Sequence, residues 1–150
     1  MTNQKFSEKN KGFTIIELLV VLAIATFLLS IVFVSVREAR AKGRDARREE
    51  DMKQLQNALN IYHVNSRSFP TCSLGVITGI NDCLSQALRS DDTVGSVSTD
   101  PLGGGTGTCL DAASHVYCYE SADGSAYTMH YSLETDSIPG KSSGWQQVNP

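Results

Sequence analysis

The sequence predicts an α+β protein in which one long N-terminal helix carries a small antiparallel β-sheet on its second half. The helix is indicated first by an uncharged apolar run that continues without Gly or Pro into a charged segment. After the charged segment, apolar residues recur at the spacing of one helix face. The sheet is indicated by two alternating runs that flank an Asp-Gly turn. The chain has 150 residues, 41% of them hydrophobic, but many of these lie near the N-terminus. The remainder must therefore have a small core.

The apolar run is long enough to cross a bilayer once. Residues 18–36 carry no charge, and as a helix they would reach about 29 Å, close to the hydrocarbon thickness of a membrane. The segment before them holds Lys5, Lys9 and Lys11 against Glu8, a basic bias that keeps an N-terminus in the cytoplasm. We therefore expect a single-pass protein of the cytoplasmic (inner) membrane whose remainder faces outward.

A charged segment follows the apolar run. Between Arg37 and Lys53, seven basic and five acidic residues are interleaved at helical spacing. We expect ion pairs within the helix or with a neighbouring chain, on a solvated surface, rather than a lipid or nucleic-acid site. Beyond Lys53, three basic residues oppose nine acidic ones. Such an acidic remainder repels DNA, so direct binding of nucleic acid is not expected.

The helix is expected to run from Phe13 to Asn65 or Ser66. Pro70 disfavours helical geometry at its predecessor, and no apolar stripe continues beyond this point. Gly43 is the weak position of the helix, because Gly costs a helix interior up to about 1 kcal/mol relative to Ala. The apolar face behind the charged segment consists of Met52, Leu55, Ala58, Leu59 and Tyr62.

Short apolar islands among Ser, Thr, Gly and Asp predict small elements after the helix. Asn81 or Asp82 is expected to cap a short helix that ends at Leu88. Residues 115–120 and 127–134 are expected to form a hairpin, and residues 145–148 are a candidate edge strand. The side chains expected to cover the long helix are Tyr127, Met129, Tyr131 and Leu133.

Four cysteines lie in the part expected outside the cytoplasm, where thiols tend to be oxidised. They form no CxxC or Cys/His pattern, so metal binding is the weaker interpretation. We prefer the pairs Cys72 with Cys83 and Cys109 with Cys118, because each closes a short loop that encloses no other cysteine. Spacing alone leaves the other two pairings open.

The segment KGFTIIELLVVLAIATFLL resembles the N-terminus of the type IV pilin family, which includes the pseudopilins of type II secretion; the match is close across residues 11–36. In that family, a membrane prepilin peptidase cuts a short basic leader after a Gly, and the new terminal residue, usually Phe, is N-methylated. The resemblance implies a cut between Gly12 and Phe13 and methylation of Phe13. The family's Glu, five residues into the mature chain, falls on Glu17.

The resemblance also implies a function and partners. The chain would be a structural subunit of a type IV pilus-like filament, inserted as a prepilin, processed, and assembled through its N-terminal helix. The alternative role is that of a pseudopilin of a type II secretion system. The filament would accordingly be an extracellular pilus or a periplasmic pseudopilus. The implied partners are identical subunits, the prepilin peptidase and N-methyltransferase, an inner-membrane assembly platform with its ATPase, and membrane lipid before assembly. The domains would be a cleaved leader (1–12), a transmembrane and filament-core helix (13–36), an amphipathic helix (37–66) and a disulfide-bonded head (67–150).

Glu17 is the most informative residue of the motif. A carboxylate inside an apolar run costs on the order of 3 kcal/mol at mid-membrane and usually marks function. The free amine of Phe13 in a neighbouring subunit would offset this cost and set the axial register between subunits. The alternative is that Glu17 only snorkels to the lipid headgroups.

Two other classes of protein fit less well. A secreted enzyme with an ordinary signal peptide is disfavoured, because the apolar run is too long and no small-x-small cleavage site follows it. A single-pass membrane-anchored extracytoplasmic binding module would explain the anchor and the disulfides, but not Gly12, Phe13 and Glu17 together.

We expect no enzyme activity and no cofactor. The three histidines are scattered, and no GxSxG, HExxH or P-loop pattern occurs. Asp91, Asp92 and Asp100 lie in or near a Gly-rich loop and are weak candidates for calcium, since they lack the spacing of an EF-hand.

Overall fold

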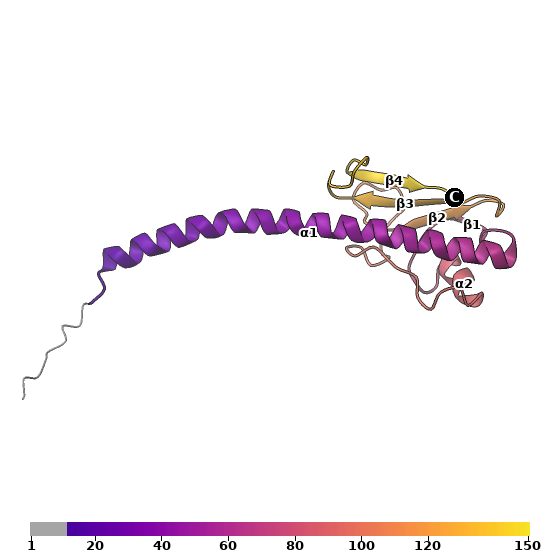
Figure 1. Ribbon diagram of the computed structural model, residues 1–150, viewed down its shortest axis with the longest axis horizontal. Coiled ribbons are helices and arrows are strands. Elements are labelled where there is room, and N and C mark those ends of the chain that lie inside the picture. Colours follow the sequence, from indigo (N-terminus) through magenta and orange to yellow (C-terminus); the bar gives the residue numbers. More distant parts are fainter. Residues whose placement is uncertain (1–11) are drawn as a thin grey trace, which may run out of the picture. The chain divides into compact units, whose positions relative to one another are not determined.

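The computed structural model describes residues 12–150 and confirms the expected α+β class (Figure 1). The chain divides into two compact units, with the boundary between Glu38 and Ala39. We call residues 39–150 the second unit, and keep the word head for residues 67–150. The elements are α1 (Ile15–Ser66), β1 (Cys72–Val76), α2 (Cys83–Ser90), β2 (Cys118–Ser121), β3 (Thr128–Leu133) and β4 (Gly144–Val148).

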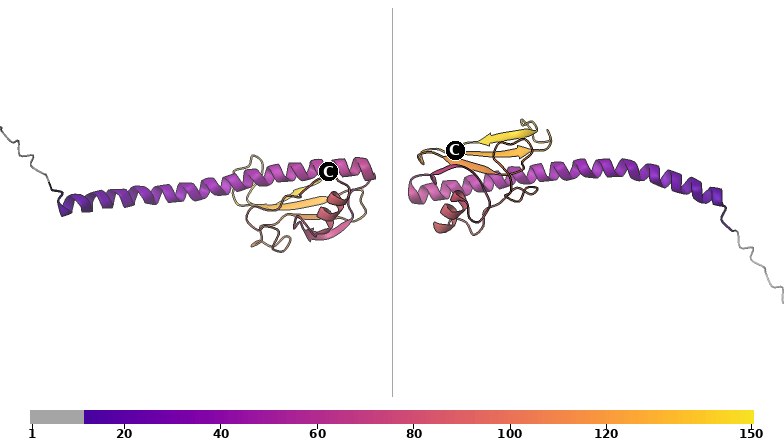
Figure 2. Two further views of the ribbon diagram at one scale, coloured as in Figure 1. Left: turned by 90° about the horizontal axis from the view of Figure 1, so that it is seen from below. Right: turned by 180° about the vertical axis from the view of Figure 1, so that it is seen from behind.

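The core of the second unit lies between the last part of α1 and the sheet, which runs beside it (Figure 2). The predicted face of α1 is buried: Leu59 is fully enclosed, and Met52 and Leu55 are almost so. From the sheet, Met129 and Tyr131 are fully enclosed in the same cluster. The alternation read from the sequence therefore oriented β3 correctly, because its apolar side chains all project to the face that covers the helix.

The sheet is a four-stranded antiparallel meander in the order β1-β2-β3-β4. The hairpin of β2 and β3 and the edge strand β4 were expected from the sequence. β1 was not, because CSLGV lacks a clean alternation and contains Gly75. A register shift between Cys72 and Gly75 leaves two residues of β1 opposite one residue of β2, which is a β-bulge.

Asp82, one of the two residues expected to cap the short helix, is the N-cap of α2. Its carboxylate accepts hydrogen bonds from the backbone N–H of Ser85 at 2.9 Å and from that of Thr78 at 2.9 Å. The preceding loop and the first turn of α2 are thus held by one side chain. The helix continues to Ser90, two residues beyond the expected end, and buries Leu84 and Leu88.

Candidate processing and assembly site

The predicted cleavage point lies just outside the first helix. α1 begins at Ile15, so the peptide bond between Gly12 and Phe13 lies in the irregular segment before it. Phe13 is 73% exposed. A protease must bind the backbone around a scissile bond, and a bond in a helix would first have to be unwound. This bond needs no such step.

Thr14 caps the N-terminus of α1. Its hydroxyl oxygen accepts a hydrogen bond from the backbone N–H of Glu17 at 3.3 Å. Thr14 and Glu17 have the spacing of a capping box, and a carboxylate in the first turn also favours the helix dipole. This cap was not predicted, although the pattern TIIE just before the apolar run indicates one. Glu17 therefore helps to start the helix whatever it does in assembly.

The apolar part of α1 is largely exposed in the described part of the first unit. The described large apolar side chains between Ile15 and Phe33 are all more than half exposed. Among the described helices, only α1 is long and apolar enough to cross a membrane, with a mean hydropathy of 2.9 over its most apolar window. The hydroxyls of Thr26 and Ser30 donate to carbonyls of the preceding turn, at 2.9 Å to Leu22 and 2.7 Å to Phe27. These polar groups are thus satisfied without water, as a lipid environment requires.

In the second unit, a buried guanidinium joins α1 to the head. Arg48 is fully enclosed. It donates to Asp45 at 2.8 Å, to Asp100 at 2.7 Å and to Glu134 at 2.6 Å. Arg44 reinforces the cluster by donating to Glu134 at 2.7 Å. We had expected the charges of this segment to be solvated. That expectation was wrong for the inward face of the helix, where three acids neutralise one buried cation.

The carboxylates of this cluster also hold two loops of the head. Asp45 accepts hydrogen bonds from the backbone N–H of Glu134 at 2.9 Å and of Thr135 at 2.8 Å, and so fastens the connection from β3 to β4. Asp100 accepts from Leu102 N–H at 2.8 Å and from Gly103 N–H at 3.2 Å. Both loops are thereby placed by residues that also contact Arg48.

The pKa values of two of these carboxyls are shifted downward. Hydrogen bonds from Arg44, and next from Arg48, lower the pKa of Glu134 to about 2. Burial acts to raise the pKa of Asp100, but the donors Arg48, Leu102 and Gly103 outweigh it and hold that pKa below its usual range. Both groups are therefore ionised at neutral pH.

Two further polar contacts connect α1 with the head. The hydroxyl of Tyr117 donates to the buried carboxylate of Asp51 at 2.8 Å. Lys141 donates to Glu49 at 2.8 Å and so ties the loop before β4 to the helix. The inward face of α1 thus carries apolar packing and, nearer its charged segment, a row of paired charges.

The structure gathers no metal-binding cluster in the part of the chain that it describes. Residues 12–150 contain no group of three or more His, Cys, Asp or Glu side chains arranged to hold a metal ion. Of the three calcium candidates, Asp100 is engaged by Arg48, Asp91 accepts from Asn65 at 2.9 Å, and Asp92 is exposed.

The histidines lie on three different parts of the chain. His63 lies on α1 with its ring 4.6 Å from the ring of Phe69. His115 lies in the loop before β2, and His130 lies on β3, 3.6 Å from Glu120. His63 thus packs against an aromatic ring, and His130 lies beside a carboxylate of the neighbouring strand.

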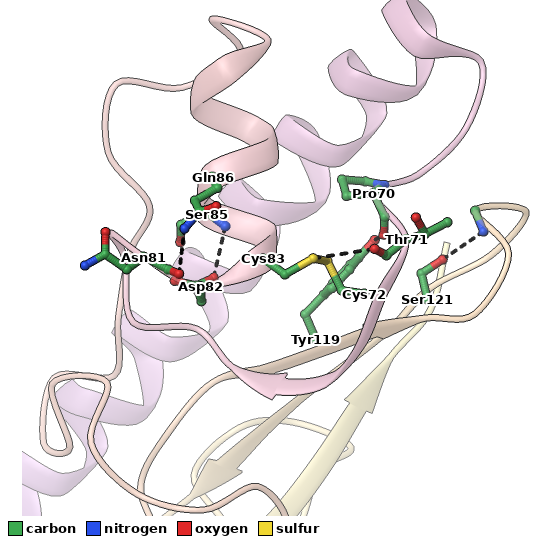
Figure 3. Close-up of a disulfide and its surroundings, with 11 residues drawn as sticks. Pro70, Thr71, Cys72, Asn81, Asp82, Cys83, Ser85, Gln86, Tyr119 and Ser121 are labelled. Carbon is green, nitrogen blue, oxygen red and sulfur yellow. Dashed lines mark hydrogen bonds between the residues drawn. A yellow bond between two sulfur atoms is a disulfide. The ribbon is translucent and has the colours of Figure 1, made fainter.

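Two disulfides close the loops of the head, in the pairing that we preferred. Cys72 is joined to Cys83 and Cys109 to Cys118, and no cysteine is free. The first joins the start of β1 to the first turn of α2, close to Asp82 (Figure 3). The second joins the loop after Asp100 to the first residue of β2.

Replacing Cys109 and Cys118 together by Ser should lower the free energy of unfolding by about 3 kcal/mol, because the open loop gains entropy in the unfolded chain. Denaturant unfolding of the full chain in detergent measures the change. Non-reducing peptide mapping of the unaltered chain is the companion measurement. Crosslinked peptides joining the Cys72 region to the Cys118 region would show that the pairing is wrong.

Comparisons with known proteins agree with these features. The family model described as the prokaryotic N-terminal methylation motif matches residues 8–33, which include Gly12, Phe13 and Glu17. The type II secretion system core protein G of Escherichia coli (strain K12) is 30% identical over 70 residues, covering 47% of this chain and 48% of that protein. The same protein of Aeromonas hydrophila is 29% identical over 73 residues, covering 49% and 51%.

The chain spans about half the length of the curated relatives it matches. No solved structure matches it at a comparable level of significance. The apolar helix and the small antiparallel sheet accompany a motif typical of prepilins. The motif match and the two relatives support the resemblance of the N-terminus to the type IV pilin and pseudopilin family.

Proposed function

We propose that this chain is a structural subunit of a type IV pilus-like filament. It is inserted in the cytoplasmic membrane as a prepilin with its N-terminus inside, cut between Gly12 and Phe13, methylated on Phe13, and assembled through α1. The observation that carries the proposal is the apolar first half of α1, whose described large side chains between Ile15 and Phe33 are more than half exposed. Such a surface needs lipid before assembly, and other copies of the same helix afterwards.

The partners follow from the same steps. Processing requires a prepilin peptidase and N-methyltransferase, and extension requires an inner-membrane assembly platform driven by an ATPase. Identical subunits then surround each helix. The head faces outward, where its four cysteines are oxidised. Catalysis has no part in this role.

A pseudopilin of a type II secretion system is the second candidate. Its specific support is that the two relatives named above are core proteins of that system. The two roles share processing and assembly, and differ in whether the filament reaches the cell surface. Filaments sheared from intact cells and identified by mass spectrometry would favour the pilus. Filaments confined to the periplasm would favour the pseudopilus.

Processing gives the most direct test of the proposal. The mature protein should begin at an N-methylated Phe13, because a small residue before the cut lets the peptidase approach the backbone. Gly12→Leu should leave the precursor in the membrane, whereas Gly95→Leu, at an exposed glycine with open surroundings in the head, should be processed normally. Intact-mass measurement distinguishes the forms. A filament subunit that retains Met1, or one cut beyond Val36, would contradict the proposal.

A further inference from the structure

One end of the outer sheet face is left open. The inner face of the sheet covers α1. The loop before β2 is fastened to the sheet by the disulfide of Cys109 with Cys118 and by the indole N–H of Trp145, which donates to the carbonyl of Asp111 at 3.2 Å. Neither contact involves the bulge of β1 or the turn between β2 and β3.

A hollow of about 430 Å³ occupies this open end. Its lining includes Ser73, Leu74, Glu120, Ser121, Asp123 and Thr128. Its wall is fixed, because the hydroxyl of Ser121 donates to the carbonyl of Ala126 at 2.6 Å and accepts from the N–H of Gly124 at 3.2 Å. The hollow is thus a built feature of the head.

The chemistry of the lining fits a long basic side chain. Leu74 is 41% exposed and offers apolar contact for an aliphatic stem. The side chain of Glu120 is 45% exposed, and Asp123 adds a second negative charge on the exposed turn. The hydroxyl of Thr128, the residue opposite Glu120 in the sheet, supplies an acceptor beside them.

Basic side chains of this kind lie near the opposite end of the second unit. Arg40 and Arg47 are two turns apart on one flank of α1, and both are exposed. Arg47 is 67% exposed and has only a 3.9 Å contact to Asp51. The hollow lies beside the other end of α1, because the carbonyl of Gly124 accepts from Phe69 N–H at 2.8 Å, just after the helix ends. Along the helix axis, Arg47 and Ser66 are about 28 Å apart.

An acidic hollow at one end and exposed arginines near the other suit a head-to-tail contact. Contacts between two different patches of the same molecule generate a helical filament when the rotation between copies does not close into a ring. We propose that Arg47 of one copy enters the hollow of the next copy and pairs there with Glu120. Arg40 adds charge to the same flank. This inference rests on the proposed function, because the second copy is a neighbouring subunit of the filament.

The test uses the full chain in cells that carry its assembly machinery. Glu120→Lys should reduce filament yield by about tenfold or more, because it places like charges together in each contact. Arg47→Glu should do the same, and the double variant Glu120→Lys/Arg47→Glu should restore filaments, because the pair is then reversed. Asp92→Lys is the matched control. It makes the same change of charge at an exposed acid outside the hollow, and should leave the yield unchanged.

A second measurement locates the contact directly. Glu120→Cys combined with Arg47→Cys should give crosslinked oligomers from filaments on non-reducing gels, whereas Asp92→Cys combined with Arg47→Cys should not. If the single charge variants assemble like the unaltered chain, or the double variant is no better than either single variant, this contact is excluded while the filament role stands. If the unaltered chain forms no filaments, the proposed function itself fails.

Discussion

Replacing Arg48 by Met should lower the free energy of unfolding by about 3–5 kcal/mol, the usual cost of removing one partner from a buried ion cluster. The substitution leaves Asp45 and Asp100 buried without the cation that they contact at 2.8 and 2.7 Å. These carboxylates would have to take up protons or admit water, and the two loops that they hold would loosen. Denaturant unfolding of the full chain in detergent measures the loss.

The neighbouring residue supplies the control. Arg47 has the same side chain as Arg48 and lies on the same helix, but it is 67% exposed. Arg47→Met should change the free energy of unfolding by less than about 0.5 kcal/mol. If the two variants lose the same stability, the cluster around Arg48 does not hold the head to α1, and general charge loss on the helix would be the better explanation.

Glu17→Ala should give normal membrane levels of processed protein but few or no filaments. The methylated amine of Phe13 in a neighbouring subunit would then be buried without a counter-charge, which disfavours docking by several kcal/mol. The substitution removes a carboxylate from an apolar segment, so insertion should be at least as good as before. The head should keep both disulfides, because they lie in the other unit. Filament counts by electron microscopy and immunoblots of membranes give the two readouts.

The cap at Thr14 provides a matched control for Glu17. The hydrogen bond that Thr14 accepts comes from the backbone N–H of Glu17, which Glu17→Ala retains. This substitution therefore removes the carboxylate but keeps the capping hydrogen bond. Thr14→Val does the reverse, and should weaken the helix start by about 1 kcal/mol while filaments still form. Wild-type filaments from Glu17→Ala cells would favour the snorkelling alternative. Loss of filaments in both variants would point to helix capping as the role of Glu17.

Local patterns in the sequence predicted most of the fold. The apolar face around Leu59 and the alternation around Met129 each repeat with the period of one element, so a short window of sequence contains the whole signal. Asp82 was readable as a cap for the same reason. β1 was not predicted, because a bulged five-residue strand that contains Gly75 has too few alternating positions to be recognised.

The buried charges could not be predicted in the same way. Arg48 and Asp45 are three residues apart on α1 and look like an ordinary surface pair, but Arg48 also meets Asp100, 52 residues farther along the chain. Arg48 precedes Met52 by four residues and so lies in line with the apolar face of α1, whereas its exposed neighbour Arg47 does not. The local pattern does not show that Asp100 and Glu134, far along the chain, meet Arg48 on that face. The motif at Gly12 and Phe13 was readable because its residues are contiguous.

The position of the disulfides bears on how the molecule would carry mechanical load. Both bonds lie within the head, and neither includes a residue of α1. The head follows α1 in the chain instead of interrupting it, so tension between the ends of α1 passes through the helix main chain and bypasses the sheet. The ion pairs at Arg48 and the packing at Leu59 then have only to keep the head in place. The crosslinks resist unfolding by heat or denaturant, while tensile strength in a filament would depend on the helices alone.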